Sequence, residues 1–260
     1  MARKLIIGIA GYTGEMGGRH LRAIRTCLDR LDCTADFYLY VRHPKPVDFP
    51  ATICASEEEF YTRNYDLLVL AMHPHHRRTA YLSLASGVTT ANLVYLEKPL
   101  WTLSAPQQDR RVFTDFKNKY ASRTVVNFQE NFDPLTQLII TLLQGEKQGV
   151  PVLTVKDIFC HRSKDRTNES ERLHKDNRHS EPIIIQEAVH DLGFAMHILS
   201  SLTRPLPSLQ ILSAHAYDLK HTTGDTIPLA GSSYAMLTTQ QHDTHIMLIN
   251  SFIDPLARFK

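Results

Sequence analysis

A lysine in the segment Leu96-Glu97-Lys98-Pro99-Leu100 is the leading candidate for chemistry in this chain. It follows a short apolar run, Leu93 to Leu96, which we expect to be a strand of a parallel sheet. Open α/β sheets bind ligands at the carboxyl edge, where burial and a neighbouring cation can lower the pKa of a lysine. Lys98 would then give or take the proton of a hydroxyl. The alternative is a solvated loop lysine, because Glu-Lys-Pro is a common tripeptide.

A glycine-rich stretch, Gly11-Tyr12-Thr13-Gly14-Glu15-Met16-Gly17-Gly18, lies between an expected strand and an expected helix. Glycines at such a turn let the backbone approach a pyrophosphate held at the N-terminus of the helix. The stretch therefore predicts a dinucleotide site. The expected contacts come from six consecutive residues: Gly11, Tyr12, Thr13, Gly14, Glu15 and Met16. The alternative is a tight turn that needs glycine only for its geometry.

The end of the second expected strand reads Leu39-Tyr40-Val41-Arg42-His43 and carries no acidic residue. Proteins that prefer NAD place an acidic side chain here to bind the ribose hydroxyls, whereas an arginine suits a 2′-phosphate. Arg42 therefore favours NADP as the cofactor, with NAD as the second choice. The alternative is that Arg42 is an ordinary exposed arginine of a loop.

Three histidines, His73, His75 and His76, lie close together and raise a metal site as a hypothesis. No acidic or cysteine ligand completes the set, so we expect no metal. The four cysteines are scattered and form no C-x-x-C pair, which argues against both a zinc site and a disulfide framework and favours a reducing, cytoplasmic setting.

The composition is that of an ordinary globular protein. Of 260 residues, 43% are apolar and 22% are charged, and the formal net charge is +2. This balance does not indicate a nucleic-acid partner. The apolar stretch Leu5 to Ala10 is too short for a signal-peptide core or a membrane span, so we expect no membrane association.

Apolar runs alternate with amphipathic stretches through the first half, which is typical of β-α-β units around a buried parallel sheet. The expected strands are Leu5 to Ala10, Asp36 to Val41, Ala51 to Cys54, Asp66 to Met72, Leu93 to Leu96 and Thr124 to Phe128. The expected helices are His20 to Leu31 (apolar face Leu21, Ile24, Leu28 and Leu31), Arg78 to Ser86 and Ala105 to Tyr120. Residues 1–130 are therefore predicted to form an NADP-binding Rossmann domain.

Around Asp133 the pattern changes, and Pro134 is expected to open a helix whose apolar face is Leu135 to Leu143. The alternating strands expected beyond it predict one open, mainly antiparallel sheet: Val152 to Phe159, Leu209 to Tyr217, Ser233 to Thr239 and His245 to Phe252. The polar run Arg162 to Glu181 reads as a surface loop or a lid, and Ile183 to Leu202 as a helix. Residues 131–260 would form an α+β domain for substrate binding and oligomerisation.

Several of these segments, in the same order, resemble the Gfo/Idh/MocA oxidoreductases, the glucose-fructose oxidoreductase and inositol dehydrogenase group. The matching pieces are Gly17-Gly18-Arg19-His20, the run Asp66 to His76 followed by Arg77 to Gly87, Glu97-Lys98-Pro99-Leu100, Asn127-Phe128 with Phe132-Asp133-Pro134, and His190-Asp191 on the later helix. The resemblance implies a Rossmann domain followed by an α/β domain whose open sheet often forms a homo-oligomer interface.

The resemblance also assigns roles. Lys98 would be catalytic, and His190 would assist proton transfer or bind substrate hydroxyls, with the substrate held between Lys98 and the helix of His190. Near the nicotinamide the expected lining is Met72, His73, Pro74 and His76, with Glu97 fixing the ring. The expected substrate contacts are Lys98, Asn127, Gln186, Glu187 and His190. Without the resemblance, His190 reads as a partly buried structural histidine. Asp191 and Glu187 read as structural or substrate-orienting groups.

Three features depart from the pattern of that family. The glycine turn reads G-x-x-G-x-x-G, and Gln186 stands four residues before His190, where sugar and inositol dehydrogenases often carry Asp. The sequence ends at Lys260, so we expect a second domain that is short or truncated. Dihydrodipicolinate reductases have a similar glycine turn, but their histidine- and lysine-rich substrate motif is not found here.

Two functions follow from these patterns. The first is an NADP-dependent oxidoreductase that moves a hydride to or from a carbonyl, hydroxyl or imine carbon of a small polar substrate such as a sugar derivative, with Lys98 as acid or base. The alternative is a non-catalytic NADP-binding module of the same fold that regulates or meets a protein partner. The lysine of Glu97-Lys98-Pro99 favours the enzyme, because a binding module does not need it.

Overall fold

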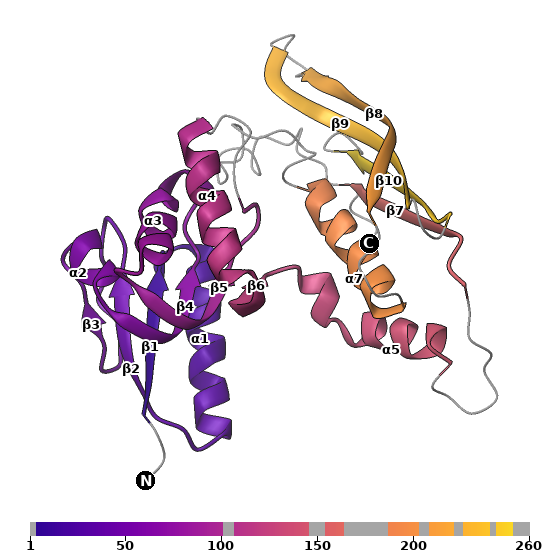
Figure 1. Ribbon diagram of the computed structural model, residues 1–260. Coiled ribbons are helices and arrows are strands. Elements are labelled where there is room, and N and C mark those ends of the chain that lie inside the picture. Colours follow the sequence, from indigo (N-terminus) through magenta and orange to yellow (C-terminus); the bar gives the residue numbers. More distant parts are fainter. Residues whose placement is uncertain are drawn as a thin grey trace. The chain divides into compact units, whose positions relative to one another are not determined.

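Two separate sheets organise the chain in the computed structural model (Figure 1). The structure describes residues 4–100, 107–145, 154–163, 187–202, 208–220, 226–239 and 243–251. The chain divides into an N-terminal unit, Met1–Asn127, and a C-terminal unit, Phe128–Lys260. Each unit has a sheet and a hydrophobic core of its own.

The N-terminal sheet has six parallel strands in the order β3-β2-β1-β4-β5-β6. The strands are β1 (Leu5–Ala10), β2 (Ala35–Tyr40), β3 (Thr52–Ile53), β4 (Asn64–Leu70), β5 (Thr90–Leu96) and β6 (Thr124–Val126). The direction of winding reverses between β1 and β4, which is the point where Rossmann sheets bind their ligands. The predicted Rossmann fold is therefore confirmed.

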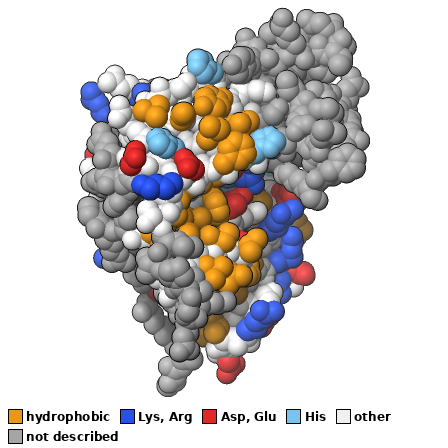
Figure 2. Space-filling model, turned by 90° about the vertical axis from the view of Figure 1, so that its right-hand side faces the viewer, with side chains coloured by type: hydrophobic (Ala, Val, Ile, Leu, Met, Phe, Trp, Pro, Cys, Tyr) orange, Lys and Arg blue, Asp and Glu red, His pale blue; other side chains and the backbone are white. Residues whose placement is uncertain are grey.

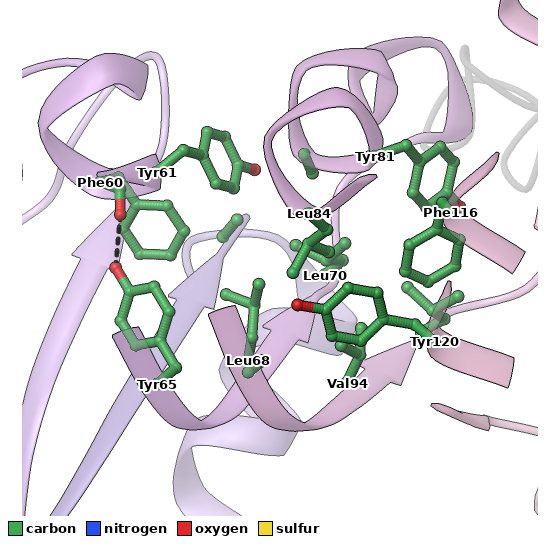
Figure 3. Close-up of a cluster of buried hydrophobic side chains, with 14 of the residues drawn as sticks. Phe60, Tyr61, Tyr65, Leu68, Leu70, Tyr81, Leu84, Val94, Phe116 and Tyr120 are labelled. Carbon is green, nitrogen blue, oxygen red and sulfur yellow. Dashed lines mark hydrogen bonds between the residues drawn. The ribbon is translucent and has the colours of Figure 1, made fainter. Parts of the chain in front are cut away.

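Helices cover both faces of this sheet, and the side chains of each strand alternate between them. The helical segments are α1 (Glu15–Arg30), α2 (Glu57–Tyr61), α3 (Arg78–Ser86), α4 (Gln107–Tyr120) and the short 3-10 turns η1 (Pro74–His76) and η2 (Ala121–Arg123). On β4, Val69 packs in the core under α1, while Leu68 and Leu70 pack in the core under α3 and α4. Figure 3 shows this second core, where the hydroxyl of Tyr65 donates to the carbonyl of Phe60 (2.6 Å).

Helix α1 corrects two expectations. It begins at Glu15 instead of His20, because Gly17 already belongs to its first turn and lies against the carbonyl of Gly11, where any side chain would collide. It ends before Leu31, which was expected on its apolar face. Leu31 is the C-cap residue and is 70% exposed, because its backbone turns out of the helix there.

Helix α2 was missed, although the sequence carries a signal for it. The Ser56 hydroxyl accepts from the amide of Glu59 (3.0 Å), and the Glu59 carboxylate accepts from the amide of Ala55 (2.8 Å). This reciprocal arrangement is a form of the capping box. The helix has only five residues, too few for a helical repeat of apolar side chains, yet it delivers Phe60 and Tyr61 to the core.

The C-terminal sheet has the order β7-β10-β9-β8. Its strands are β7 (Asp157–Ser163), β8 (Leu209–Lys220), β9 (Thr226–Thr239) and β10 (His245–Ser251). The pairs β10-β9 and β9-β8 are antiparallel, so the expectation of a mainly antiparallel sheet is confirmed. Strand β7, however, runs parallel to β10, so the sheet is not wholly antiparallel. Alternation of apolar residues reports one buried face and carries no information on strand direction.

The segments around the polar run differ from expectation. Strand β7 begins at Asp157 and continues to Ser163, so Arg162 belongs to a strand instead of the expected loop. Most of that predicted loop and residues 183–186 of the predicted helix lie outside the described residues. A wide helical turn at 187–188 leads into α7 (Val189–Leu202). Upstream, η3 (Gln129–Phe132) leads into α5 (Pro134–Leu143), where Asp133 caps the helix by accepting from the amide of Leu135 (2.8 Å).

One face of the C-terminal sheet is buried under α7, where Ile158, Ile246 and Leu248 pack with Leu199. The other face carries Phe159, Met247 and Met236, which lie opposite one another on β7, β10 and β9. Phe159 is 63% exposed. Figure 2 shows hydrophobic side chains gathered beside histidines on the side of the molecule that it views. Among the described helices, none is long and apolar enough to cross a membrane.

Candidate functional site

The glycine turn joins β1 to α1 at the carboxyl edge of the N-terminal sheet. Gly11 has a φ of +87°, and a Cβ there would lie 2.8 Å from the amide nitrogen of Met72. Gly17 lies against the carbonyl of Gly11, where a Cβ would collide. Two of the glycines are therefore required by the fold itself, as the alternative interpretation of this turn anticipated.

Gly14 is different, because the protein does not need a glycine there. It is the N-cap of α1 with an ordinary φ of −72°, and the nearest atom to an added Cβ is the Gly11 carbonyl oxygen at 3.4 Å. A glycine at the N-cap offers no side chain to the N–H groups of the first helical turn, which stay available to an anion. Thr13 and Met16 beside it are half-buried. This end of α1 fits a pyrophosphate.

Two residues of the turn have partners of their own. The carboxylate of Glu15 is exposed and lies 2.7 Å from Arg19, one turn along the helix, so its charge is partly balanced. The ring of Tyr12 is buried. Its hydroxyl donates to the carbonyl of Lys45 (2.6 Å) and accepts from the amide of Lys45 (3.0 Å). Tyr12 thus connects the glycine turn to the loop that follows β2.

The same loop carries Arg42, two residues beyond the end of β2. Its side chain is exposed, and within the described part of the chain it forms no ion pair. Strand β2 pairs with β1 so that Tyr40 lies beside Ala10, the residue before the glycine turn. Arg42 and the turn therefore lie at the same edge of the sheet.

Glu97, directly after β5, is buried and joins three elements. Its Oε1 atom lies 2.5 Å from Nε2 of His20 on α1 and 2.6 Å from Nδ2 of Asn127 after β6. Burial alone would raise the pKa of Glu97, but the hydrogen bonds from His20 and Asn127, with the positive charges of His20 and Arg77, hold it below its usual value. The carboxylate is therefore ionised. The side-chain amide of Asn127, a predicted substrate contact, donates its hydrogen bond to this carboxylate.

Lys98 is half-buried and follows Glu97 at the carboxyl edge of β5. The buried guanidinium of Arg77 donates to the carbonyls of Glu97 (2.5 Å) and Pro99 (2.7 Å), the residues on either side of Lys98. The hydroxyl of Tyr81 donates to the carbonyl of Leu100 (2.9 Å). The backbone around the candidate acid–base group is thus held at the carbonyls of Glu97, Pro99 and Leu100.

The segment after β4 carries the predicted nicotinamide lining. Met72, His73 and Pro74 are half-buried and His76 is exposed. Burial, together with the charges of His75, Arg77 and His76, lowers the pKa of His73 to about 4, so its ring is neutral at neutral pH. The rings of His73 and His75 stack with centroids 4.8 Å apart. Within the described residues, no three His, Cys, Asp or Glu side chains converge as metal ligands.

The C-terminal unit holds the predicted His190 in a buried polar cluster. Its Nδ1 atom lies 2.9 Å from Oε2 of Glu130, whose other carboxylate oxygen accepts from Arg162 (2.6 Å). Burial would raise the pKa of Glu130, but the hydrogen bonds from His190 and Arg162 hold it far below its usual value. An ionised carboxylate at Nδ1 fixes both the orientation and the tautomer of an imidazole. The contact with Glu130 therefore fixes the orientation of the His190 ring.

Two further carboxylates complete this cluster. Oε2 of Glu187 lies 3.2 Å from Nε of Arg162, an ion pair without hydrogen-bond alignment. Burial and the neighbouring Glu130 and Glu187 raise the pKa of Asp191 to about 6, although Arg162 opposes the shift. Among the described residues, Oδ2 of Asp191 finds no hydrogen-bond partner. Gln186, predicted beside them, lies outside the described residues.

Four residues that shape the two polar clusters, one in each unit, were not anticipated: His20, Arg77, Glu130 and Arg162. All four contact atoms that are distant in sequence or lie on another element. His20, Arg77 and Glu130 fall within or beside segments that the resemblance singles out, whereas Arg162 does not, and nothing local distinguishes Arg77 or Arg162 from a surface arginine. Lys98 belongs to the N-terminal unit and His190 to the C-terminal unit.

Solved structures share this fold over nearly the whole chain. A myo-inositol dehydrogenase from Corynebacterium glutamicum matches 96% of this chain and 68% of its own, with a TM-score of 0.68 and 15% identity. A scyllo-inositol dehydrogenase from Lactobacillus casei, with bound NAD(H) and scyllo-inositol, matches 96% of this chain and 71% of its own, with a TM-score of 0.69 and 14% identity.

The transcriptional regulator Gal80p from Kluyveromyces lactis matches as well, over 98% of this chain and 66% of its own, with a TM-score of 0.70 and 14% identity. No protein-family model and no curated protein sequence matches the chain. At these identities the comparisons define the fold, which is that of the Gfo/Idh/MocA oxidoreductases and their relatives. The resemblance inferred from the sequence is thereby confirmed for the fold.

Proposed function

We propose that this protein is an oxidoreductase that uses a nicotinamide dinucleotide, with NADP(H) preferred over NAD(H), and acts on a carbonyl, hydroxyl or imine carbon of a small polar substrate. The observation that carries the proposal lies in one unit: the glycine turn after β1 and Lys98 after β5 stand at the same edge of the parallel sheet, on either side of β4. That edge is where Rossmann sheets bind dinucleotides.

The residues present fit such a cofactor. The N–H groups of the first turn of α1 would hold the pyrophosphate. Gly14 leaves space for it, although the packing of the protein does not require a glycine at that position. Arg42 would bind the 2′-phosphate, because it is exposed at that edge and its guanidinium can form paired hydrogen bonds with phosphate oxygens. When bound, the nicotinamide supplies the two-electron redox chemistry.

In this proposal, the residues of the chain move protons and hold groups in place. Lys98 gives or takes the proton of the substrate oxygen or nitrogen, and Arg77 and Glu97 hold the backbone beside it. His190 assists, with Glu130 fixing its ring. The inositol dehydrogenases of similar fold suggest a sugar derivative or another polyol as the class of substrate.

A second candidate function is a non-catalytic, dinucleotide-binding regulator that contacts a protein partner. The likeness to the transcriptional regulator Gal80p favours it, because that protein has the same fold with a different task. The lysine after β5 favours the enzyme. We also propose that the exposed face around Phe159, Met236 and Met247 joins copies of the chain in a homo-oligomer.

The deciding experiment measures NADPH consumption against a panel of sugars, keto acids and imines for the wild type, Lys98→Ala and the control Lys117→Ala, a change at an exposed residue of α4. The proposal expects turnover of at least one substrate and a loss of about 100-fold or more in Lys98→Ala alone. Equal turnover in all three proteins would exclude the role of Lys98. Tight NADPH binding with no turnover of any substrate would favour the regulator.

A further inference from the structure

Arg77 is the largest fully buried side chain of the described chain, with 1% of its surface exposed. A guanidinium stays protonated inside proteins, so a full positive charge lies in the interior of the N-terminal unit. Within the described residues, no carboxylate forms an ion pair with it. Its hydrogen bonds go to backbone carbonyls.

Four hydrogen bonds from the guanidinium reach three carbonyls on two separate segments. Nε and Nη2 donate to the carbonyl of Met72, at 2.9 and 2.7 Å, in the loop that follows β4. Nη1 donates to the carbonyls of Glu97 and Pro99, at 2.5 and 2.7 Å, in the loop that follows β5. One side chain therefore ties the two neighbouring loops together and brackets Lys98.

A buried charge is an unfavourable way to fill this space. Taking a charged group out of water is costly even when it is hydrogen-bonded, and packed apolar side chains often replace buried ionic groups without loss of stability. What an apolar side chain cannot supply is a rigid, planar set of donors aimed at several carbonyls at once. The retained guanidinium thus fixes backbone positions, and the positions it fixes are those beside Lys98.

We infer that Arg77 is a positioning residue for Lys98: its guanidinium holds the carbonyls of Glu97 and Pro99 against that of Met72 and so sets where the amine of Lys98 is presented. The assignment of a reaction to that amine rests on the proposed function. The geometric claim does not, because all the residues concerned lie in one unit. Arg77 acts through Lys98 and does not itself touch the substrate.

The test compares Arg77→Lys and Arg77→Met with Tyr65→Phe, a matched control that loses a buried hydrogen bond to the Phe60 carbonyl in the same unit but away from this loop. Lys98 is labelled with trace acetic anhydride between pH 7 and 10. Peptide mass spectrometry then gives its rate relative to the exposed Lys117 of the same molecule. Thermal melting reports the stability of each variant.

We expect both Arg77 variants to change the Lys98 to Lys117 labelling ratio by on the order of threefold and to alter the pH profile of that ratio. Tyr65→Phe should keep the wild-type ratio, although its Tm falls by an amount similar to that of the Arg77 variants. Where turnover is found, kcat should fall by about tenfold or more with a smaller change in the Kd for NADPH, because a small misplacement of a catalytic group is costly. Unchanged labelling in folded Arg77 variants would overturn the inference.

Two further outcomes are separated by the design. If the wild type has no turnover with any substrate, the proposed function fails, yet the labelling ratio still decides the role of Arg77. If both Arg77 variants fail to fold, Tyr81→Phe replaces them, since it removes the donor to the Leu100 carbonyl and the interaction of the Tyr81 hydroxyl with Arg77. A Lys98 to Lys117 labelling ratio in Tyr81→Phe that differs from the wild-type ratio supports the inference, and an unchanged ratio overturns it.

Discussion

The Nε2 atom of His20 lies 2.5 Å from the Oε1 atom of Glu97, which joins the first helix to the residue immediately before Lys98. Because the pKa of Glu97 is held below its usual value, the carboxylate is the acceptor and the imidazole N–H is the donor. Asn127 donates to the same oxygen from the end of β6. At the edge of the sheet that carries Lys98, the ionised carboxylate of Glu97 thus connects the end of β5 to α1 and to the end of β6.

This arrangement predicts a pH-dependent contribution to stability. Glu97→Gln should lower the free energy of unfolding at pH 7 by about 1–3 kcal/mol, because it leaves buried donors without their anion. The pKa of Glu97 is lowered in the folded state, so the contribution is complete above its usual value of about 4.5 and is lost as the pH falls through the folded-state pKa. Urea unfolding at pH 7 and pH 4 measures the difference.

The difference between wild type and Glu97→Gln should therefore be smaller at pH 4 than at pH 7. Glu15→Gln serves as the control, since that carboxylate is exposed and should change stability little at either pH. A deficit in Glu97→Gln that is equal at both pH values would contradict the assignment of an ionised, hydrogen-bonded carboxylate.

The glycine turn allows stability to be separated from binding. Gly17→Ala should destabilise the protein by about 1–3 kcal/mol, because its Cβ collides with the Gly11 carbonyl. Gly14→Ala has space and should cost no more than about 1 kcal/mol. If a pyrophosphate binds here, Gly14→Ala should still weaken NADPH binding by about tenfold, or about 1.4 kcal/mol. Calorimetric titration of both variants checks this, and undiminished affinity in Gly14→Ala would place the cofactor elsewhere.

Arg42 is expected to distinguish the two nicotinamide cofactors. Arg42→Ala should weaken NADPH binding by about 10- to 100-fold, the loss expected for a charged hydrogen bond to phosphate, and leave NADH binding unchanged. Arg30→Ala, at the opposite end of α1, is the control for a general loss of positive charge. The ratio of the two dissociation constants is the measurement, and a ratio unaffected by Arg42→Ala would exclude this residue as the reader of the 2′-phosphate.

Asp191 should make the protein less stable as the pH rises. Burial, then repulsion by Glu130 and Glu187, raises its pKa to about 6 from a usual value of 3.8, so the folded state holds a proton that the unfolded state releases between these values. Stability therefore falls from about pH 4 to pH 6 through this group. Asp191→Asn should remove that fall and gain on the order of 2–3 kcal/mol relative to wild type at pH 7.5.

The comparison for Asp191→Asn is the difference in unfolding free energy from wild type at pH 4 and at pH 7.5. Asp157→Asn, an exposed carboxylate on β7, is the control and should show no such trend. Loss of stability in Asp191→Asn at pH 7.5 would mean that the ionised form of Asp191 is needed in the cluster.

The sequence was sufficient for the features that depend on local patterns. The strands β1, β4 and β5 are apolar runs, and a parallel sheet buried on both faces demands such runs. The position of Lys98 after β5 followed directly from them. Helix α2 was missed because five residues are too few for a periodic signal, although Ser56 and Glu59 mark its start.

The residues that could not be predicted are polar side chains that act over long distances in the chain. Arg77 resembles a solvated arginine of a basic run, and only the folding of β4 beside β5 brings its donors to the carbonyls of Glu97 and Pro99. Arg162 is the first residue of a charged stretch that the sequence predicts to be a surface loop or a lid. Its place on β7, next to Glu130, depends on a parallel pairing with β10 that no alternation pattern reports.

The two hydrogen bonds between the Tyr12 hydroxyl and the backbone of Lys45 connect the glycine turn to the loop in which we propose that Arg42 reads the 2′-phosphate. They anchor the loop after β2 at one residue, and the stretch that carries Arg42 and His43 lies between this anchor and the strand. If residues 42 to 44 are exchanged, the backbone positions of Tyr40 and Lys45 can therefore be treated as fixed. A grafted loop of different length that moves Lys45 would also displace the glycine turn through Tyr12, so under the proposed function it would change the affinity for NADPH and NADH alike.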